Sequence, residues 1–382
     1  MTHREQPIVY LGSRKVDNSQ HTALIMYRML KCIEGRKITI IEIGESSYSS
    51  ARLETALYIN IPEILIRIKK TRLYRVLTPL QSQASEVWAW RALRKTRFGR
   101  CTILTVANDW GWILAHKLAK KHELALQIVI HDDYGWQPFN GASFSKRRER
   151  KFAECLQFCE RIYVVSEEMR QAYKERYGVD SSVLYPMRNF NLNNEPVEKS
   201  AIGGERRFLI CHAGTLYKDT IEGIDELTQR LGNSSMEFGI VGARNDDAVL
   251  SRLTTTRIRS FGYFKRPEDA MQVLKKRADI LILIQPRSDQ SLLRYSFPSK
   301  FVDYTSLDKP VVCIADEWSP IARFMIEHGL REYLFCYDYD SATRKIRELF
   351  ANSAERERAR ATFRELGEMY FSRNAVMQIF QP

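Results

Sequence analysis

The feature that most constrains the fold is a repeated alternation of short apolar segments with amphipathic ones. In the first half of the chain, apolar segments of strand length lie at 8–12, 38–44, 101–108, 126–133 and 161–166. The stretches between them, such as 20–33, carry apolar residues at helical spacing. Strands that are apolar along their whole length are buried on both faces, as in parallel sheets covered by helices. The pattern therefore predicts an α/β fold with a parallel sheet.

A break in this alternation divides the chain. Proline, asparagine and glycine accumulate over 186–206, and beyond it the alternation resumes with apolar segments at 208–214, 236–242 and 278–284. A length of 382 residues suits two domains of about 180 residues each. We expect two Rossmann-like domains, 1–186 and 187–365, and a C-terminal helix, 366–382, that packs back on the first domain.

The net charge, the lengths of the apolar runs and the cysteine spacing narrow the possible partners and location of the protein. The net charge of +13 attracts polyanions, which include nucleic acid, anionic lipid and phosphorylated substrates. No run of about 18 uncharged apolar residues is present, and the apolar run at 7–11 is too short for a signal peptide. The seven cysteines are scattered, without zinc-ligand spacing. We expect reduced thiols, a cytoplasmic protein and no metal site.

One motif in the second half indicates a family. Segment 294–312, RYSFPSKFVDYTSLDKPVV, has the spacing and residue types S-x-P-S-K-x-x-[DE]-Y followed by K-P-V. It resembles the donor-binding signature of GT-B glycosyltransferases, of the retaining, group 1 or family 4-like kind. The resemblance implies two Rossmann-like domains facing a central cleft, with the nucleotide-sugar donor bound by the second and the acceptor by the first.

The residues of this motif suit a diphosphate. A helix that begins near Ser299 presents free backbone N–H groups to an anion, and Lys300 adds a positive charge in its first turn. By resemblance, Asp303 accepts hydrogen bonds from ribose hydroxyls. The alternative is that Pro298 and Ser299 only start a helix, which is a common arrangement in any α/β protein.

A second donor loop is expected after the apolar segment 208–214. Gly214 lets the backbone approach a ligand, and Lys218 can neutralise phosphate. The segment Gly214-Thr215-Leu216-Tyr217-Lys218 is similar to a G-[ST]-L-Y-K loop of the family, but Asp219 and Thr220 depart from the pattern. A solvated surface lysine is the alternative for Lys218.

Candidate residues of the first half lie at the ends of three of its apolar segments. His131 and Asp132 lie where the family contacts the donor sugar, so the resemblance makes them catalytic candidates; Asp133 is an alternative to Asp132. Asn108 and Asp109, beside an aromatic residue, are candidates for acceptor binding, as is Gly12 in the first loop. The alternative for the first loop is an ordinary polar β–α connection.

The expected function is transfer of a hexose from a nucleotide-diphosphate sugar to a glycan or lipid-linked acceptor in bacterial-type surface polysaccharide assembly. No cofactor and no metal are expected, because the adjacent pairs Asp132-Asp133 and Asp246-Asp247 differ from the D-x-D arrangement of metal-dependent transferases. Retention of configuration rests on the resemblance alone. A nucleotide-sugar epimerase and a non-catalytic or nucleic-acid-binding protein are the alternatives; without a nucleic-acid-binding module we expect no nucleic-acid partner.

Basic and apolar residues are interleaved over 62–100, which includes Lys69, Lys70, Arg72 and Arg75 and the tryptophans Trp88 and Trp90. Such a surface suits an anionic membrane, where each basic residue adds about 1 kcal/mol of attraction. We expect peripheral association with the inner face of the membrane beside the acceptor. The alternative is that the apolar residues pack on the first domain's sheet and the basic ones are solvated.

Overall fold

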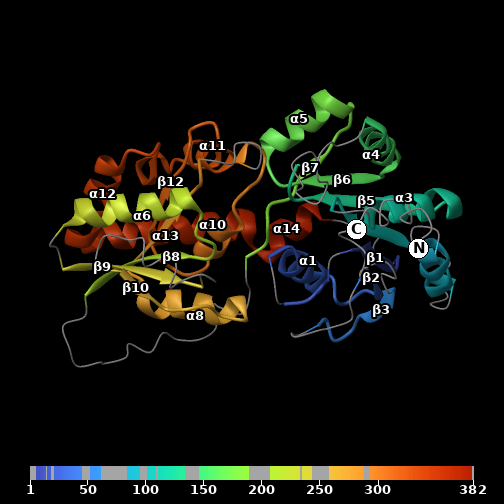
Figure 1. Cartoon of the computed structure of the whole chain (residues 1–382), viewed down its shortest axis with the longest axis horizontal. Helices are drawn as coiled ribbons and strands as arrows, with labels where there is room; N and C mark the ends of the chain where they lie inside the picture. Colours follow the sequence, from blue (N-terminus) through green and yellow to red (C-terminus); the bar gives the residue numbers. More distant parts are fainter. Residues whose placement is uncertain are drawn as a thin grey trace. The chain divides into compact units, whose positions relative to one another are not determined.

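A computed structural model of the chain describes most of its residues in two compact units (Figure 1). The described residues are 6–13, 15–18, 21–44, 52–61, 84–94, 101–108, 111–133, 146–188, 207–232, 235–242, 258–287 and 293–380. The first unit comprises Met1–Tyr185 and Met377–Pro382, and the second comprises Pro186–Val376.

The first unit is built on a seven-stranded parallel sheet in the spatial order β3-β2-β1-β4-β5-β6-β7. The strands are β1 Ile8–Gly12, β2 Ile38–Ile43, β3 Leu57–Ile61, β4 Thr102–Val106, β5 Ala125–Ile130, β6 Arg161–Val164 and β7 Ser182–Val183. Strands β1, β2 and β4 are buried along their whole length, which is why their sequences are apolar throughout.

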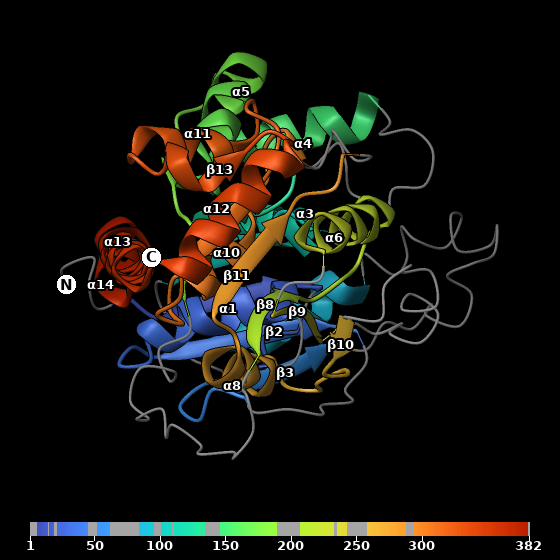
Figure 2. The same cartoon turned by 90° about the vertical axis from the view of Figure 1, so that its left-hand side faces the viewer.

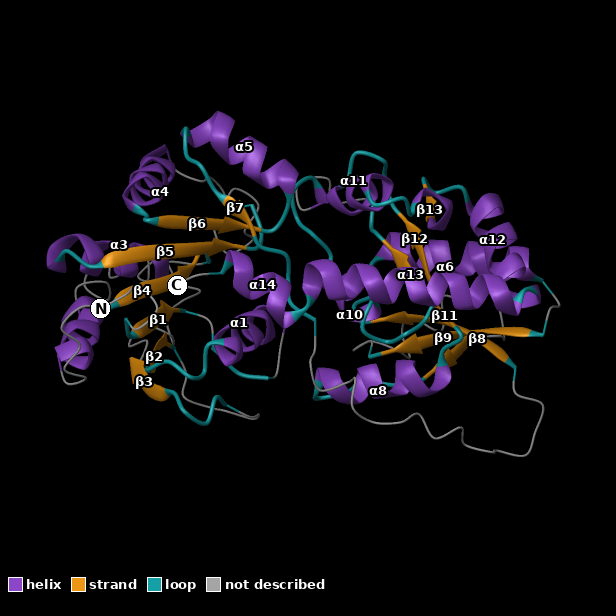
Figure 3. Cartoon of the chain, turned by 180° about the vertical axis from the view of Figure 1, so that it is seen from behind, coloured by secondary structure: helices purple, strands orange, loops and turns teal. Residues whose placement is uncertain are grey.

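Helices cover this sheet (Figure 3). They are α1 His21–Cys32, α3 Gly111–His122, α4 Lys146–Phe158 and α5 Glu167–Tyr177, with a further helix over 84–94. Fully buried Trp112 of α3 packs edge-on against Phe152 of α4, with ring centroids 5.2 Å apart. Helix α5 is capped at both ends: the Ser166 hydroxyl accepts a hydrogen bond from the Met169 amide at 3.1 Å, and Gly178 ends the helix at φ 64°.

The second unit has a six-stranded parallel sheet in the order β10-β9-β8-β11-β12-β13 (Figure 2). The strands are β8 Phe208–Ala213, β9 Met236–Val241, β10 Ile258–Ser260, β11 Ile280–Ile284, β12 Val311–Ile314 and β13 Leu334–Phe335. The predicted fold class, two α/β halves with parallel sheets, is confirmed.

The helices of the second unit are α6 Lys218–Leu231, α8 Pro267–Arg277, α10 Ser299–Tyr304, α11 Pro320–Glu327, α12 Tyr339–Ala351 and α13 Ser353–Phe371, with a 3₁₀ turn η6 at Arg331–Tyr333; α14 Arg373–Ile379 follows. Helices α6 and α12 pack together on one face of the sheet, and α8 covers the other (Figures 1 and 3). Among the described residues, no helix has the length and apolar character needed to cross a membrane.

A buried ion-pair network joins α12 to α13. Lys345, with its side chain 8% exposed, lies 2.8 Å from Glu355 Oε1, 2.9 Å from Glu332 Oε2 and 3.2 Å from Glu348 Oε2. Arg358 contacts Glu355 and Glu332 as well, each at 2.8–2.9 Å. Because every buried charge has an opposite charge within contact distance, the network avoids the penalty of an unpaired buried ion.

The chain end returns to the first unit. Phe380 is fully buried and packs against Tyr163 of β6, with ring centroids 5.5 Å apart. All seven cysteines lie within the described residues and none forms a disulfide; Cys336, directly after β13, is the exposed one among them.

Candidate functional site

The strand order of the second unit places its topological switch point between β8 and β11. From β8 the chain adds β9 and β10 on one side, and from β11 it adds β12 and β13 on the other. Ligands of such sheets bind beyond the carboxyl ends of the strands at this point. The residues at these ends are Gly214 after β8 and Gln285 after β11.

Three glycines form the carboxyl edge beside the switch point. Gly214, Gly242 and Gly262 follow β8, β9 and β10, with φ of 84°, 78° and 74°. The Gly214 amide donates to Val241 O at 2.8 Å, and the Gly242 amide donates to Gly262 O at 2.8 Å. Left-handed backbone favours glycine, and the absence of side chains leaves the backbone open to a ligand. Of the three, only Gly214 is predicted from the sequence to bind the donor.

Lys300 lies over Gly214. A Cβ atom at Gly214 would be 2.8 Å from Lys300 Cε and 3.2 Å from Lys300 Nζ. The ammonium donates to Thr215 O at 3.3 Å. Desolvation lowers the pKa of this half-buried lysine to about 8. The structure thus brings together two of the predicted donor-binding residues, from segments more than 80 positions apart.

The other residues of the motif lie on the same short helix. Pro298 is the N-cap residue of α10 and Ser299 is its first residue, so this segment does start a helix, one of only six residues. Ser299 and Asp303 are both half-buried. The Asp303 carbonyl accepts a hydrogen bond from the Ser306 hydroxyl at 2.6 Å, which helps to end the helix.

Lys218 is placed differently from Lys300. It is the first residue of α6, its side chain is 82% exposed, and its ammonium lies 3.6 Å from Glu222, one helical turn later. An exposed pair of this kind contributes at most a few tenths of a kcal/mol to stability. The donor role of Lys218 stays a prediction.

The candidates of the first unit follow three neighbouring strands. Gly12 ends β1, Asn108 follows β4 and His131 follows β5, and these strands are adjacent in the sheet. Because the strands are parallel, all three residues lie at one edge, and the switch point of this sheet falls between β1 and β4. Asp109 lies outside the described residues.

His131 is a neutral side chain at this edge. Desolvation lowers its pKa to about 4, and neither ring nitrogen has a hydrogen-bond partner within the described part of the chain. Neighbouring Asp132 is half-buried. Asp133 is buried and accepts hydrogen bonds from Tyr173 at 3.2 Å and Arg176 at 3.3 Å. These contacts tie Asp133 to α5, and the role of Asp132 beside His131 stays a prediction.

Packing restricts Gly12. A Cβ at Gly12 would overlap the hydroxyl group of fully buried Tyr10. A Cβ at Gly111, the first residue of α3, would lie 2.8 Å from the Ser13 amide and 2.9 Å from Gly12 Cα. The first turn of α3 therefore packs directly on the loop after β1, a contact that Gly111 permits and that no motif in the sequence indicates.

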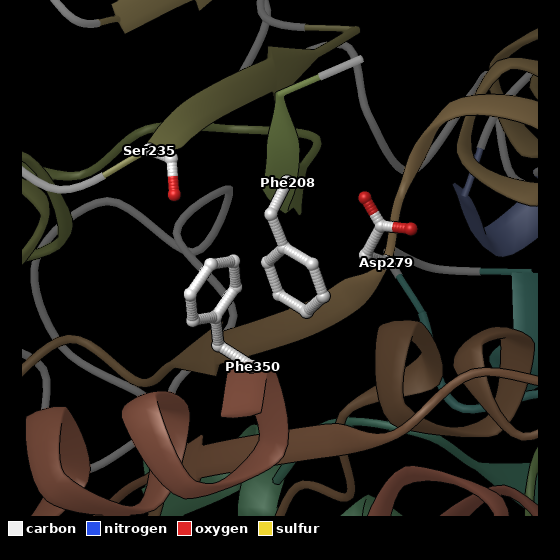
Figure 4. A pocket seen from close by; sticks show the side chains of 4 residues that line it. All are labelled: Phe208, Ser235, Asp279 and Phe350. Carbon is white, nitrogen blue, oxygen red and sulfur yellow. The ribbon is translucent and has the colours of Figure 1, made fainter. Parts of the chain in front are cut away.

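A separate hollow lies at the opposite edge of the second sheet (Figure 4). It has a volume of about 420 Å³ and is lined by Phe208, Ser235, Asp279 and Phe350. Phe208 begins β8, and Ser235 and Asp279 directly precede β9 and β11, so the hollow lies at the amino ends of the strands. It is distinct from the edge that carries Gly214 and Lys300.

No group of three or more metal-ligating side chains occurs within the described residues.

Comparison of the sequence with protein-family models and with curated proteins finds no match. Solved structures are similar over nearly the whole chain. HepE of Anabaena in complex with UDP has a TM-score of 0.68 at 14% identity, covering 98% of each chain. Sucrose-phosphate synthase of Thermosynechococcus elongatus has a TM-score of 0.67 at 13% identity, covering 98% of this chain and 97% of that one.

The lipopolysaccharide outer core galactosyltransferase WaaB has a TM-score of 0.62 at 15% identity, again covering 98% of each chain. At these identities the likeness establishes the fold. The chain has the GT-B fold that these glycosyltransferases share.

Proposed function

We propose that this chain is a glycosyltransferase that moves a hexose from a nucleotide-diphosphate sugar to a glycan or lipid-linked acceptor. The observation that carries the proposal is the Lys300 ammonium over Gly214, at the switch point of the second sheet. The GT-B structures it resembles include HepE with UDP and glucose and HepE with UDP-glucose. A nucleoside diphosphate is therefore the ligand class that best fits this edge.

The proposed donor site combines a positively charged side chain with glycine residues whose main chain no side chain covers. Departure of a nucleoside diphosphate builds negative charge on phosphate oxygens, and a fixed ammonium stabilises that charge most where water is excluded. Lys300 supplies the ammonium, and Gly214, Gly242 and Gly262 let the diphosphate approach the main chain. In this proposal Ser299 contributes to phosphate binding, Asp303 binds the ribose hydroxyls, and neither a metal nor a cofactor is required.

The first unit provides the groups for the sugar and the acceptor. His131 stays neutral at physiological pH because burial lowers its pKa to about 4, so its ring can both donate and accept a hydrogen bond to a sugar hydroxyl. In this proposal Asp132 acts beside it, while Gly12, Asn108 and Asp109 bind the acceptor. Retention of configuration is proposed from the resemblance of segment 294–312.

A membrane-facing acceptor is the second part of the proposal. Within 62–100 the structure describes the helix over 84–94; the basic residues 67–75 lie outside the described residues. On that helix Val87 is 49% and Trp88 51% exposed, and Arg91 and Arg94 are exposed as well. Exposed apolar side chains next to cations fit an anionic lipid surface. We propose that this surface docks the enzyme at the inner face of the membrane, in surface polysaccharide assembly.

Nucleotide binding tests the donor assignment. A thermal-shift panel of UDP, GDP, ADP, CMP and TDP identifies the donor class by the nucleotide that raises the melting temperature. Lys300→Ala is expected to weaken that nucleotide by on the order of 2 kcal/mol, as expected for loss of a charge-assisted contact. Lys276→Ala is the matched comparison, since Lys276 is an exposed lysine of the same unit in the last turn of α8, which precedes the amino end of β11. Unchanged affinity in Lys300→Ala would contradict the donor site.

Product formation tests the reaction class. A transferase releases nucleotide from its sugar donor faster when acceptor is present, whereas an epimerase converts the donor without releasing nucleotide. His131→Ala is expected to lower turnover more than nucleotide affinity. An equal loss of nucleotide affinity would show that His131 does not act on the sugar.

Co-sedimentation with vesicles containing anionic lipid tests the docking surface. The wild-type protein is expected to sediment at low salt, and a variant with Arg91→Glu, Arg94→Glu and Trp88→Ser is expected to remain in solution. Reversing Arg170 and Lys174 on α5, which are 51% and 64% exposed, is the control for net charge alone. Equal sedimentation of all three proteins, or none by the wild type, would remove the membrane from the proposal.

A further inference from the structure

The two central strands of the second sheet separate at the switch point. Strands β8 and β11 pair at Ile210–Ile280 and Cys211–Leu281. Beyond these pairs β8 continues to Ala213 alongside β9, and β11 continues to Ile284 alongside β12. The last residues of β8 and β11 thus face each other without the ladder hydrogen bonds that join the rest of the sheet.

Side-chain hydrogen bonds replace the missing ladder hydrogen bonds between the ends of β8 and β11. The Ala213 amide donates to the Tyr304 hydroxyl at 2.9 Å. His212 Nδ1 lies 3.2 Å from Ile282 O, and the Tyr304 hydroxyl lies 3.5 Å from the same carbonyl oxygen. A buried main-chain group left without a hydrogen-bond partner destabilises the fold. His212 and Tyr304 therefore bridge the gap between the two strands by satisfying their backbone.

His212 is suited to this place because it is neutral. It is fully buried, and burial together with nearby Lys300 lowers its pKa to about 3. With Ile282 O as its partner, Nδ1 carries the proton of the neutral ring. A protonated His212 would repel the nearby Lys300 ammonium, whereas the neutral imidazole does not.

Tyr304 connects this bridge to Lys300. The two residues are four positions apart on α10, which places their side chains on the same face of the helix. Tyr304 is fully buried, and its hydroxyl holds the end of β8. That hydrogen bond links α10, which carries Lys300, to the end of β8 beside Gly214.

We propose that His212 and Tyr304 are positioning residues: they fix α10 to the separated ends of β8 and β11 and so hold the Lys300 ammonium over Gly214, where the donor diphosphate binds. This inference rests on the proposed function for the identity of the ligand. The predicted effect on the reactivity of the Lys300 amine can be measured without any ligand.

The first test replaces Tyr304 by phenylalanine, which keeps the ring and removes the hydroxyl. In competitive acetylation read by mass spectrometry, Lys300 of the wild-type protein should react with an apparent pKa near 8. In Tyr304→Phe the amine gains solvent and its pKa moves toward 10.4, so its reactivity at pH 8 falls by about tenfold or more. UDP affinity, measured by calorimetry, should fall about three- to tenfold, the equivalent of one net hydrogen bond.

A matched control separates positioning from general loss of stability. Tyr333 is also buried, and its hydroxyl donates to Glu355 Oε1 at 3.0 Å, in the ion-pair network that joins α12 to α13. Tyr333→Phe should lower the melting temperature comparably but leave Lys300 reactivity and UDP affinity unchanged. An equal change of Lys300 reactivity in both variants would overturn the inference.

The second test uses His212. Asparagine places an amide nitrogen close to the position of Nδ1, so His212→Asn should keep the hydrogen bond to Ile282 O and keep Lys300 reactivity. His212→Leu fills the space without a donor and should reproduce the labelling change of Tyr304→Phe. Wild-type Lys300 reactivity in both His212→Leu and Tyr304→Phe would refute the positioning role.

The two proposals fail in different ways. If Lys300→Ala binds UDP as tightly as the wild type, or the wild type binds no nucleotide, the donor site is wrong, and the labelling result still decides the positioning role. If Lys300→Ala loses UDP affinity while Tyr304→Phe keeps both affinity and labelling, the donor site stands and the positioning role is wrong.

Discussion

Replacing Gly214 by alanine perturbs the proposed donor site through one methyl group. The residue has φ of 84°, and the added Cβ would lie 2.8 Å from Lys300 Cε. Ordinary carbon contacts are about 3.5–4.0 Å, so Lys300 must retreat by about 1 Å. The change therefore strains the backbone and displaces the ammonium at once.

The two effects have separate magnitudes. The left-handed conformation costs an alanine about 1–2 kcal/mol, which lowers the melting temperature by about 2–8 °C for a unit of this size. Moving an ammonium from about 3 to about 4 Å from a phosphate oxygen, at an effective dielectric constant of about 20, loses about 1.4 kcal/mol. Nucleotide affinity should then fall about tenfold.

Gly329→Ala is the matched control for this prediction. Gly329 lies in the same unit with φ of 73°, and a Cβ there meets nothing within 4 Å. Both variants should lose similar stability in thermal melts, and only Gly214→Ala should lose UDP affinity in calorimetry. Equal UDP affinities in the two variants would refute the idea that Lys300 acts from its position over Gly214.

Three further predictions follow from charges and packing. UDP affinity should fall as the pH rises through about 8, because the Lys300 ammonium loses its proton there, and Lys300→Ala should abolish this dependence in calorimetry between pH 6.5 and 9.5. Contacts with Arg358 and Lys345 lower the pKa of Glu355 from 4.5 to about 2, so its stabilisation is present above pH 4.5 and is lost as the pH falls toward 2. Glu355→Gln should therefore flatten the loss of stability in acid urea titrations; an unchanged pH slope would contradict it. Gly111→Ala should destabilise the protein by about 1–3 kcal/mol in urea, because its methyl group meets main-chain atoms of Gly12; wild-type stability would show that α3 can shift freely.

Most of the strands could be read from the sequence. β1, β2 and β11 are fully buried, so each appears as an unbroken run of apolar residues. The ends of α5 were equally readable, since Ser166 and Gly178 act through local hydrogen bonds and backbone conformation. Apolar runs and helix caps depend on residues that are close together in the sequence, so they can be predicted from it.

The site was readable only in part. Lys300 and Gly214 were found separately through motifs, but their contact depends on how α10 packs beside β11. His212 looked like any residue of an apolar strand, and its role depends on where β8 leaves β11. Gly242 and Gly262 lie at the same edge of the sheet as Gly214 because β9 pairs with β8 and β10 pairs with β9. This strand order cannot be read from the sequence.

The distribution of thiols offers a way to observe this edge of the molecule. Burial raises the pKa of Cys101, Cys211 and Cys313, which keeps these thiols protonated and shielded at neutral pH. Cys336 is exposed and directly follows β13, at the same carboxyl edge of the second sheet as Gly214. A maleimide fluorophore added to the unmodified protein should therefore attach first at Cys336, which would give a spectroscopic reporter near the proposed nucleotide site without any engineered residue.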